Sequence, residues 1–286
     1  MLDLILCIIA CALLVIGFKI FEKLKITAFQ AIVVNYGVAS LIGFIYEPNS
    51  SQIIYQIHQP WFINGCILGL VFISNFYIMA LSAQKIGASV TSVASKMSLV
   101  VTVLFGIFYL NELVNGFKII GVLLALLSVF LIIQINSKEL NKKFIVLPII
   151  LFWGGGFIDI SLNYNQETYL KNGGSGLFSM TTFGAAFILG LIVLIYRLIA
   201  GKEIFKLKNI IGGIILGVVN WLSIFLLLRT LKNPAWDSST AYTIINIGIL
   251  LLVVIIGVLI FKERLNKKQW FGIVLALAAI ILMSIA

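Results

Sequence analysis

Ten long apolar segments dominate the sequence and determine what kind of structure it can form. Each has about the 17–25 residues that a helix needs to cross about 30 Å of hydrocarbon. In lipid, a helix satisfies its backbone hydrogen bonds internally, whereas a strand does so only in a closed barrel. The sequence therefore predicts an all-α membrane protein with ten transmembrane helices. The predicted spans are Leu2–Phe18, Thr27–Tyr46, Trp61–Leu81, Ser89–Leu110, Phe117–Ile135, Phe144–Asn163, Leu177–Ile199, Ile210–Leu231, Ser238–Phe261 and Gln269–Ile285.

Composition and charge agree with a lipid environment. Hydrophobic residues make up 62% of the 286 residues and charged residues 10%, whereas soluble domains have about 45–50% and about 25%. The formal net charge of +10 would suggest nucleic acid in a soluble protein. Here the lysines cluster in short loops between the spans, which is typical of cytoplasmic loops beside anionic lipid. We therefore expect the lipid bilayer as the partner, and no nucleic acid.

The sequence repeats itself, and polar and glycine positions carry the repeat. Residues 99–128 resemble residues 250–279 at an offset of 151, the third span resembles the eighth at 148, and the second resembles the seventh at 147. Apolar residues match often by chance, but glycines, Glu and Asn do not. The informative matches are Gly106, Glu112, Asn115 and Gly121 with Gly257, Glu263, Asn266 and Gly272, then Gly65 and Gly69 with Gly213 and Gly217, and Gly37 with Gly184.

An odd number of spans in each repeat has a topological consequence. We expect residues 1–137 to form a first five-helix repeat and residues 138–286 a second, within one membrane unit. Because five crossings end on the opposite side of the membrane, the second repeat must be inverted relative to the first. Inverted repeats are typical of secondary transporters, although channels and membrane enzymes also contain repeats.

Basic residues predict the orientation. If both termini lie outside the cytoplasm, the inside segments are 19–25, 85, 138–143, 197–208 and 262–268. These segments hold 15 of the 20 Lys and Arg residues, and the outside segments hold 4. The positive-inside rule therefore favours both termini outside, in a multi-pass protein of the cytoplasmic (inner) membrane.

Two short turns resemble those of a known family. Leu110–Leu113 followed by Gly121, and Phe261–Arg264 followed by Gly272, are similar to the Leu-Gly-Glu turn and glycine-rich helix of the drug/metabolite transporter superfamily, in its EamA-like branch. The glycine of that turn is replaced here by Asn111 and Lys262, and the proline common in family helices four and nine is absent. The resemblance implies ten helices, two repeats, and a substrate cavity between the halves lined mainly by helices one, three, four, six, eight and nine.

Two ionisable residues lie inside predicted spans. Lys96 lies in the fourth and Asp159 in the sixth. A charge near the bilayer centre costs about 2.5–3.5 kcal/mol on insertion scales, so such residues usually face a cavity or each other. Lys96 could neutralise an anionic group of a substrate, and Asp159 could bind a cationic group or shuttle a proton. Alternatively, the two could form an ion pair that fixes helix packing, or Lys96 could extend toward the interface.

Amides and aromatic residues within the spans complete the candidate site. Membrane amides often join helices, for roughly 1 kcal/mol or less, so each has a structural alternative. The resemblance implies that the candidates for the lining of the cavity are Lys96, Asn75, Tyr77, Asp159, Trp153, Trp221, Tyr242 and Asn246.

Other polar and small residues favour structural roles. We expect Glu112 and Glu263 to cap the helices that follow them, where a carboxylate meets exposed N–H groups. Cys7, Cys11 and Cys66 lie in spans without metal or disulfide spacing, so they are interpreted as small packing residues. The run Gly154–Gly156 would permit a kink or a close helix contact.

The sequence thus predicts a secondary transporter of a small organic solute, an amino acid or another metabolite, with export as the expected direction. A multidrug or cation efflux carrier is the alternative, and a membrane enzyme or lipid-handling scaffold is less favoured, because the single histidine, His58, lies in a loop. No nucleotide-binding loop is present, so a gradient would have to drive transport. No cofactor or metal is expected, coupling to a proton or another ion stays open, and the protein would be a monomer or a homodimer.

Overall fold

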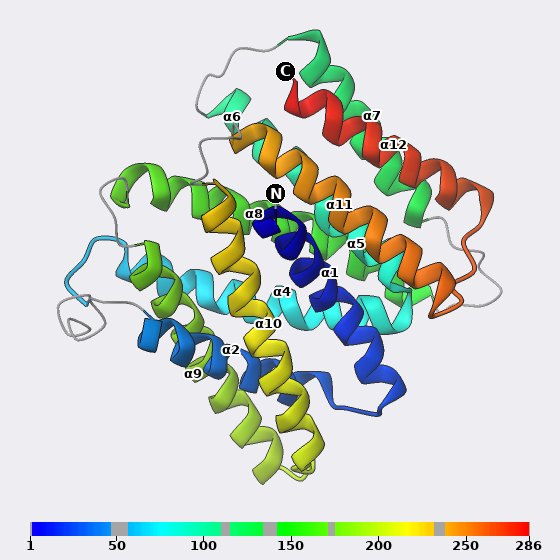
Figure 1. Cartoon of the computed structure of the whole chain (residues 1–286). Coiled ribbons are helices and arrows are strands. Elements are labelled where there is room, and N and C mark those ends of the chain that lie inside the picture. Colours follow the sequence, from blue (N-terminus) through cyan, green and yellow to red (C-terminus); the bar gives the residue numbers. More distant parts are fainter. Residues whose placement is uncertain are drawn as a thin grey trace. The chain divides into compact units, whose positions relative to one another are not determined.

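A computed structural model describes residues 2–46, 57–109, 115–133, 142–170, 175–231 and 238–285, and within these ranges the chain is almost entirely helical (Figure 1). All ten predicted spans form helices and no strand occurs among the described residues, so the predicted all-α fold is confirmed. The helices are α1 (Leu2–Lys23), α2 (Ala28–Tyr46), α4 (Phe62–Lys85), α5 (Ala88–Lys96), α6 (Leu99–Phe108), α7 (Gly116–Ile133), α8 (Val146–Tyr169), α9 (Ser175–Ile199), α10 (Leu207–Leu231), α11 (Ser238–Leu259) and α12 (Lys267–Ser284).

Helix length and surface character fit a bilayer. Within the described ranges, seven spans are long and apolar enough to cross a membrane, α5 and α6 counting together as one, while α7, α8 and α11 contribute shorter apolar segments of 10–17 residues. The outer surfaces carry large apolar side chains. On α7, for example, Phe117, Leu123 and Phe130 are each more than half exposed. Large apolar side chains exposed along whole helices need a lipid environment.

Several predicted spans differ from the observed helices: α1 continues past Phe18 to Lys23, and α4 continues past Leu81 to Lys85. The fourth span is not one helix, because it breaks between α5 and α6. The predicted linker after Asn163 begins too early, since α8 continues to Tyr169. Helix ends are the least certain part of a sequence-based prediction because flanking polar residues are compatible with both a last turn and a loop.

The chain divides into two compact units. Unit 1 comprises Met1–Lys19, Ile78–Phe157 and Ser223–Ala286, and unit 2 comprises Ile20–Tyr77 and Ile158–Leu222. Each unit takes corresponding helices from both predicted repeats: α2 and α9 lie in unit 2, whereas α7 and α12 lie in unit 1. The predicted repeat boundary between residues 137 and 138 falls outside the described ranges, so that division stays a prediction.

In unit 2, α2 and α9 run in opposite directions. Gln30, in the first turn of α2, donates hydrogen bonds to the Ile204 carbonyl (2.9 Å) and to Glu203 (3.0 Å), both in the turn after α9. Near the other end of α2, the Ser40 hydroxyl donates to the carbonyl of Met180, early in α9 (3.3 Å). Because α2 and α9 are corresponding helices of the two repeats, their antiparallel packing means that the second repeat is inverted.

The glycines of unit 2 pack in reciprocal pairs. A Cβ added to Gly69 of α4 would lie 2.7 Å from the Thr182 carbonyl oxygen and 2.9 Å from the Ala185 Cβ on α9. A Cβ added to Gly217 of α10 would lie 2.8 Å from the Asn35 carbonyl oxygen and 2.7 Å from the Val38 Cβ on α2. Thr182 and Ala185 follow Asn35 and Val38 by the same repeat offset of 147 residues. The repeat relationship in the sequence is therefore a symmetry of the packing.

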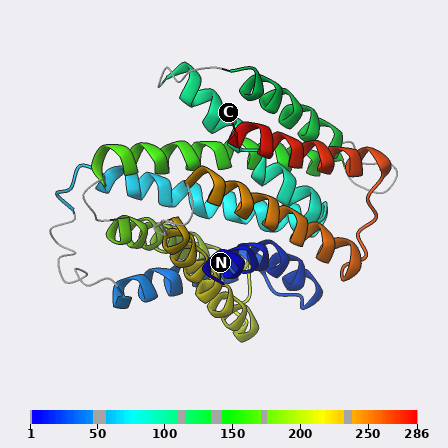
Figure 2. The same cartoon turned by 45° about the horizontal axis from the view of Figure 1, so that its top comes forward.

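Unit 1 shows the same reciprocity. Helices α7 and α12 lie side by side in Figures 1 and 2. Gly121, early in α7, approaches the backbone of α12 at Ala279 and Met283, late in that helix, while Gly272, early in α12, approaches Ser128 and Ile132, late in α7. These contacts also require antiparallel corresponding helices. Both units thus support the predicted inversion.

The carboxylate of Glu263 caps a different helix from the one expected. It accepts hydrogen bonds from the backbone N–H of Ala88, from the N–H of Ser89 (3.1 Å) and from the Ser89 hydroxyl (2.6 Å), all at the start of α5. The following helix, α12, is instead capped by Asn266, whose side chain accepts from the N–H of Gln269 (2.9 Å). The expected capping of α12 by Glu263 was therefore wrong, and Glu112 lies outside the described residues.

The turn that presents Glu263 has a left-handed backbone at the residue before it. Lys262 occupies the position of the family's glycine and has a φ of 56°, in the left-handed region that glycine adopts without steric cost. This backbone turn directs the neighbouring carboxylate of Glu263 to α5. The motif therefore links the turn after α11 to the start of α5 within unit 1.

The glycine run of α8 produces a close helix contact. A Cβ on Gly155 would lie 2.9 Å from the Ser98 Cβ, and one on Gly156 would overlap the Val101 side chain. Both contacts lie within unit 1, where α8 packs against the junction of α5 and α6. The run therefore serves intimate packing, one of its two predicted roles.

We predict that Gly156→Ala destabilises the protein by about 1–3 kcal/mol, because the added methyl overpacks the contact with Val101. Thermal unfolding of the purified protein in detergent measures the effect. Gly116→Ala is the matched control: no atom lies within 4 Å of its added Cβ, so its melting temperature should equal or exceed that of the wild type. Equal melting temperatures for Gly156→Ala and wild type would refute the close packing.

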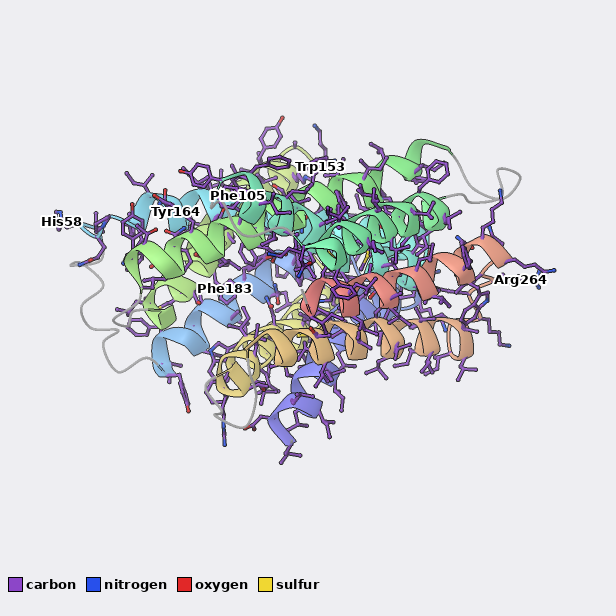
Figure 3. All side chains as sticks on the ribbon, turned by 90° about the horizontal axis from the view of Figure 1, so that it is seen from above. His58, Phe105, Trp153, Tyr164, Phe183 and Arg264 are labelled. Atoms are coloured by element: carbon purple, nitrogen blue, oxygen red, sulfur yellow. The ribbon has the colours of Figure 1, made fainter. Side chains whose placement is uncertain are left out.

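Glu263→Gln should destabilise the protein by about 0.5–2 kcal/mol, the usual range for loss of a helix cap, because the ionised carboxylate also favours the positive end of α5. A lower melting temperature in detergent would support the cap. Arg264→Gln is the control from the same turn, since Figure 3 shows the Arg264 side chain extending away from the ribbon. If the two variants melt together, the cap contributes nothing.

Candidate substrate-binding region

Lys96 lies at the end of α5, where the helix breaks inside the predicted span. The chain turns at Met97 and Ser98 before α6 begins. After the break, the N–H groups of Val100 and Val101 bond to carbonyls three residues back, at 3.0 and 2.9 Å. The Ser98 hydroxyl also donates to the carbonyl of Ser95 (2.7 Å). The backbone at the break is thus held in a tight, defined turn.

The break gives Lys96 a distinct electrostatic position. A helix C-terminus carries partial negative charge, which favours a cation in its last turn, and Lys96 is the last residue of α5. Discontinuous helices form the solute and ion sites of many secondary transporters. The sequence identified Lys96 as a charge within a span, but it did not predict the helix break. The signal for the break was the polar residues Ser95, Lys96 and Ser98 within an otherwise apolar span.

Within unit 1, Cys7 of α1 contacts α10. Cys7 and Cys11 lie one turn apart on α1. The Cys7 Sγ lies 3.7 Å from the Ser223 carbonyl oxygen. Cys7 is fully buried where α1 meets α10, which agrees with a packing role, and Cys11 is half-buried.

The other predicted residues of unit 1 have different surroundings. Trp153 is 60% exposed and shares one face of α8 with the exposed residues Val146, Ile149 and Phe157. This continuous apolar stripe favours contact with lipid over a cavity, although cavity lining by Trp153 stays a prediction. Asn246 is half-buried on α11, while Tyr242 is helical and its side chain lies outside the described set.

Unit 2 contains the remaining four predicted residues. Asp159 is half-buried on α8 and has an interaction partner. Asn75 is buried on α4, and Trp221 on α10 packs edge-on against Tyr46, with ring centroids 5.3 Å apart. Because Lys96 belongs to unit 1 and Asp159 to unit 2, their pairing stays one of the alternatives drawn from sequence.

Tyr77 has a structural role that the sequence did not reveal. Its ring packs edge-on against Phe29 (5.4 Å), and the Arg197 guanidinium lies over the Phe29 ring at 4.3 Å and 5.8 Å from the centre of the Tyr77 ring. Arg197 also forms an ion pair with Glu203 (3.0 Å). The same network continues through Gln30 to Asn209, whose amide donates to Gln30 Oε1 at 2.7 Å. These contacts hold the turn after α9 against the start of α2.

Buried polar atoms without hydrogen-bond partners mark a second polar region, in unit 2. Among the described residues these atoms include both amide atoms of Asn35, the Tyr36 hydroxyl, Asn75 Oδ1 and Thr182 Oγ1. A buried polar group without a partner costs roughly 1–3 kcal/mol, so such positions favour bound water or solute. Asn35 and Thr182 occupy equivalent places in the two repeats. Their spacing of 147 residues was the sequence signal for this pair.

The described residues contain no group of three or more His, Cys, Asp or Glu side chains that could hold a metal ion. Unit 1 offers the ammonium of Lys96 beside a helix break, and unit 2 offers buried amide and hydroxyl groups. These groups suit recognition of a small polar or anionic molecule by hydrogen bonds and charge.

Comparison with known proteins places the chain in a family. The model of the EamA-like transporter family matches residues 1–134 and 146–285. An uncharacterized protein of Haemophilus influenzae is 30% identical over 286 residues, covering 96% of this chain and 94% of that protein. A protein crystal structure with 11% identity matches 99% of this chain and 96% of its own with a TM-score of 0.60, a likeness of fold. The chain therefore belongs to the EamA-like transporter family, whose members move small solutes across membranes.

Proposed function

We propose that this protein is a secondary transporter that moves a small organic solute, an amino acid or another metabolite, out of the cytoplasm by alternating access. The observation that carries the proposal is the reciprocal antiparallel packing of corresponding helices, seen at Gly69 and Gly217 in unit 2 and at Gly121 and Gly272 in unit 1. Two similar halves in opposite orientation can exchange conformations, so that one arrangement opens inward and the other outward.

The polar residues within the spans supply the proposed solute contacts. Lys96 and Asp159 are proposed as the principal charged contacts, together with Asn75, Asn246, Trp221 and Tyr242. The helix break beside Lys96 supports its part in this assignment, because irregular backbone at membrane depth is tolerated where it lines a cavity or is buried in protein. For Tyr77 and Trp153 the structure favours packing and lipid contact, and they are the weakest members of the set.

The function is tested by uptake into proteoliposomes. Purified protein should accelerate the movement of at least one member of a panel of radiolabelled amino acids and organic acids relative to protein-free liposomes, with and without a pH gradient. Cationic dyes in the same panel test the alternative of multidrug efflux. Failure of every organic solute to move, in protein shown to be folded, would contradict the proposal.

For a solute that is transported, Lys96→Ala and Asp159→Asn should each lower the initial rate at least about tenfold, since losing one partner of a desolvated charge pair costs several kcal/mol. Asp3→Asn is the matched control, because Asp3 pairs with Arg229 (3.1 Å) at an exposed site, where an ion pair contributes little. Normal transport by both variants would remove these two residues from the site. Restoration of transport by the charge exchange Lys96→Asp with Asp159→Lys would favour a structural ion pair.

The proposed orientation has both termini outside the cytoplasm. The orientation assigns each loop to one side of the membrane, and hydrogen bonds within each unit support these assignments. Glu263 joins the basic turn 262–268 to the start of α5, and Lys208 donates to the Leu24 carbonyl (2.9 Å). Both pairs join segments assigned to the inside. The ion pair of Asp3 with Arg229 joins two segments assigned to the outside.

A reporter fused after Ala286 tests the orientation. Alkaline phosphatase, which is active only outside the cytoplasm, should be active in this fusion, and green fluorescent protein exported through the general secretory route should be dark. The reverse pattern would place the C-terminus in the cytoplasm and reject the charge-based topology.

A further inference from the structure

Hydrogen bonds join two turns of unit 2, the turn between α1 and α2 and the turn between α9 and α10. The Lys208 ammonium, at the start of α10, donates to the Leu24 carbonyl of the first turn (2.9 Å). Thr27 of the same turn donates its N–H to the Asn209 side chain (3.0 Å). The two turns therefore form one continuous surface. We call residues 24–27 and 200–208 the basic platform.

The basic platform concentrates positive charge. Its lysines, which are all exposed, are Lys25, Lys202, Lys206 and Lys208. Its single carboxylate, Glu203, is already in an ion pair with Arg197 of α9 (3.0 Å) and therefore offsets little of the lysine charge. The adjoining last turn of α1 adds one acid and one base, Glu22 and Lys23, whose formal charges cancel. The basic platform is thus a net positive surface.

Large apolar side chains lie between these lysines and are exposed with them. Each is more than half exposed, and they are Leu24, Ile204, Phe205 and Leu207. Along the chain they are direct neighbours of Lys25, Lys206 and Lys208. Apolar side chains that enter the acyl region, beside ammonium groups that reach the phosphates, are typical of a surface at the boundary of membrane and water.

The basic turn of unit 1 has similar charge but a different surface. Its four basic residues are Lys262, Arg264, Lys267 and Lys268. The large apolar residues of this turn, Phe261 and Leu265, are half-buried, and Leu265 packs against the apolar core of unit 1. Of these two segments, only the basic platform combines lysines with exposed apolar side chains.

We propose that the basic platform binds one anionic phospholipid, with the headgroup phosphate at the lysines and the acyl chains against Phe205 and its apolar neighbours. Such a lipid supplies both the negative charge and the hydrocarbon that this surface matches. Anionic lipids are found in the cytoplasmic leaflet, and both turns belong to segments assigned to that side. General attraction to the membrane would be shared by every basic turn, whereas this lipid would be retained at one place. The proposal does not depend on the transport function.

Native mass spectrometry of the full-length protein tests the site, because it resolves bound lipids by their mass. The protein in detergent is titrated with phosphatidylglycerol, which is anionic, or with zwitterionic phosphatidylcholine of the same acyl chains. The first phosphatidylglycerol should bind at least about fivefold more tightly than the first phosphatidylcholine, which is the effect expected of a single lysine beside anionic lipid.

Removal of three lysine charges from the basic platform should abolish this preference. The variant combines Lys25→Asn, Lys202→Gln and Lys206→Gln. Asparagine suits the left-handed backbone at Lys25 (φ 52°), and Lys208 is kept because it joins the two turns. Arginine at the same three positions keeps the charge and should keep the preference. Size-exclusion profiles verify that the variants are folded.

The matched control removes three charges from the basic turn of unit 1. It combines Arg264→Gln, Lys267→Gln and Lys268→Gln, and it should bind phosphatidylglycerol as the wild type does. Phe205→Ser tests the acyl contact separately. Because its side chain is exposed, the exchange should leave the fold intact and weaken the binding of both lipids.

Only a loss of preference confined to the variant of the basic platform supports the proposal. Equal losses in the two triple variants would mean that diffuse positive charge attracts the lipid, and unchanged binding in both would mean that the lipid lies elsewhere. Either result would overturn the site. Glycerol 3-phosphate, a soluble compound with a phosphate group, should not displace the bound lipid. Displacement would identify a soluble phosphate compound as the ligand and contradict a lipid site.

Discussion

Close contact between backbones at corresponding glycines is the interaction on which this structure depends. In lipid, helices gain little from hiding apolar surface, so they associate through tight packing and hydrogen bonds. Gly69 on α4 meets α9 at Thr182, and Gly217 on α10 meets α2 at Asn35. The two glycines are 148 residues apart and their two partners are 147 residues apart, which are the repeat offsets of these spans. One interface is therefore built twice, in opposite orientations, and this duplication determines how the helices of unit 2 associate.

Much of this architecture could be predicted because the bilayer imposes simple rules. A span must be long and apolar, so all ten helices were evident, and an odd number of spans per repeat required inversion. What escaped prediction depended on contacts between distant residues. The partner of Glu263 is the start of α5, 174 residues away from it at Ser89, and no local pattern indicates it. The exposure of Trp153 likewise depends on a distant contact. Gly155 packs against Ser98, and this contact determines which face of α8 is buried.

The candidate site arises where the two repeats differ. Asn246 in α11 corresponds to Ser95, and Ile247 corresponds to Lys96, at the offset of 151. The fourth span breaks beside Lys96, whereas α11 continues through the equivalent position as one helix. A symmetric scaffold thus carries a charge and a helix end in only one of its halves. In the proposed carrier, such an asymmetry would give a solute one orientation in the site, while the matched halves would retain the similarity that alternating access requires.

Access to the helix break from both sides of the membrane tests the central claim most directly. A single cysteine at Ser95, in a chain whose native cysteines are replaced by serine or alanine, can be labelled with membrane-impermeant maleimides added to sealed right-side-out or inside-out vesicles. Alternating access predicts labelling from either side, with a transported solute shifting the balance between the two. Labelling from one side only, whether or not solute is present, would contradict a carrier and indicate a fixed cavity.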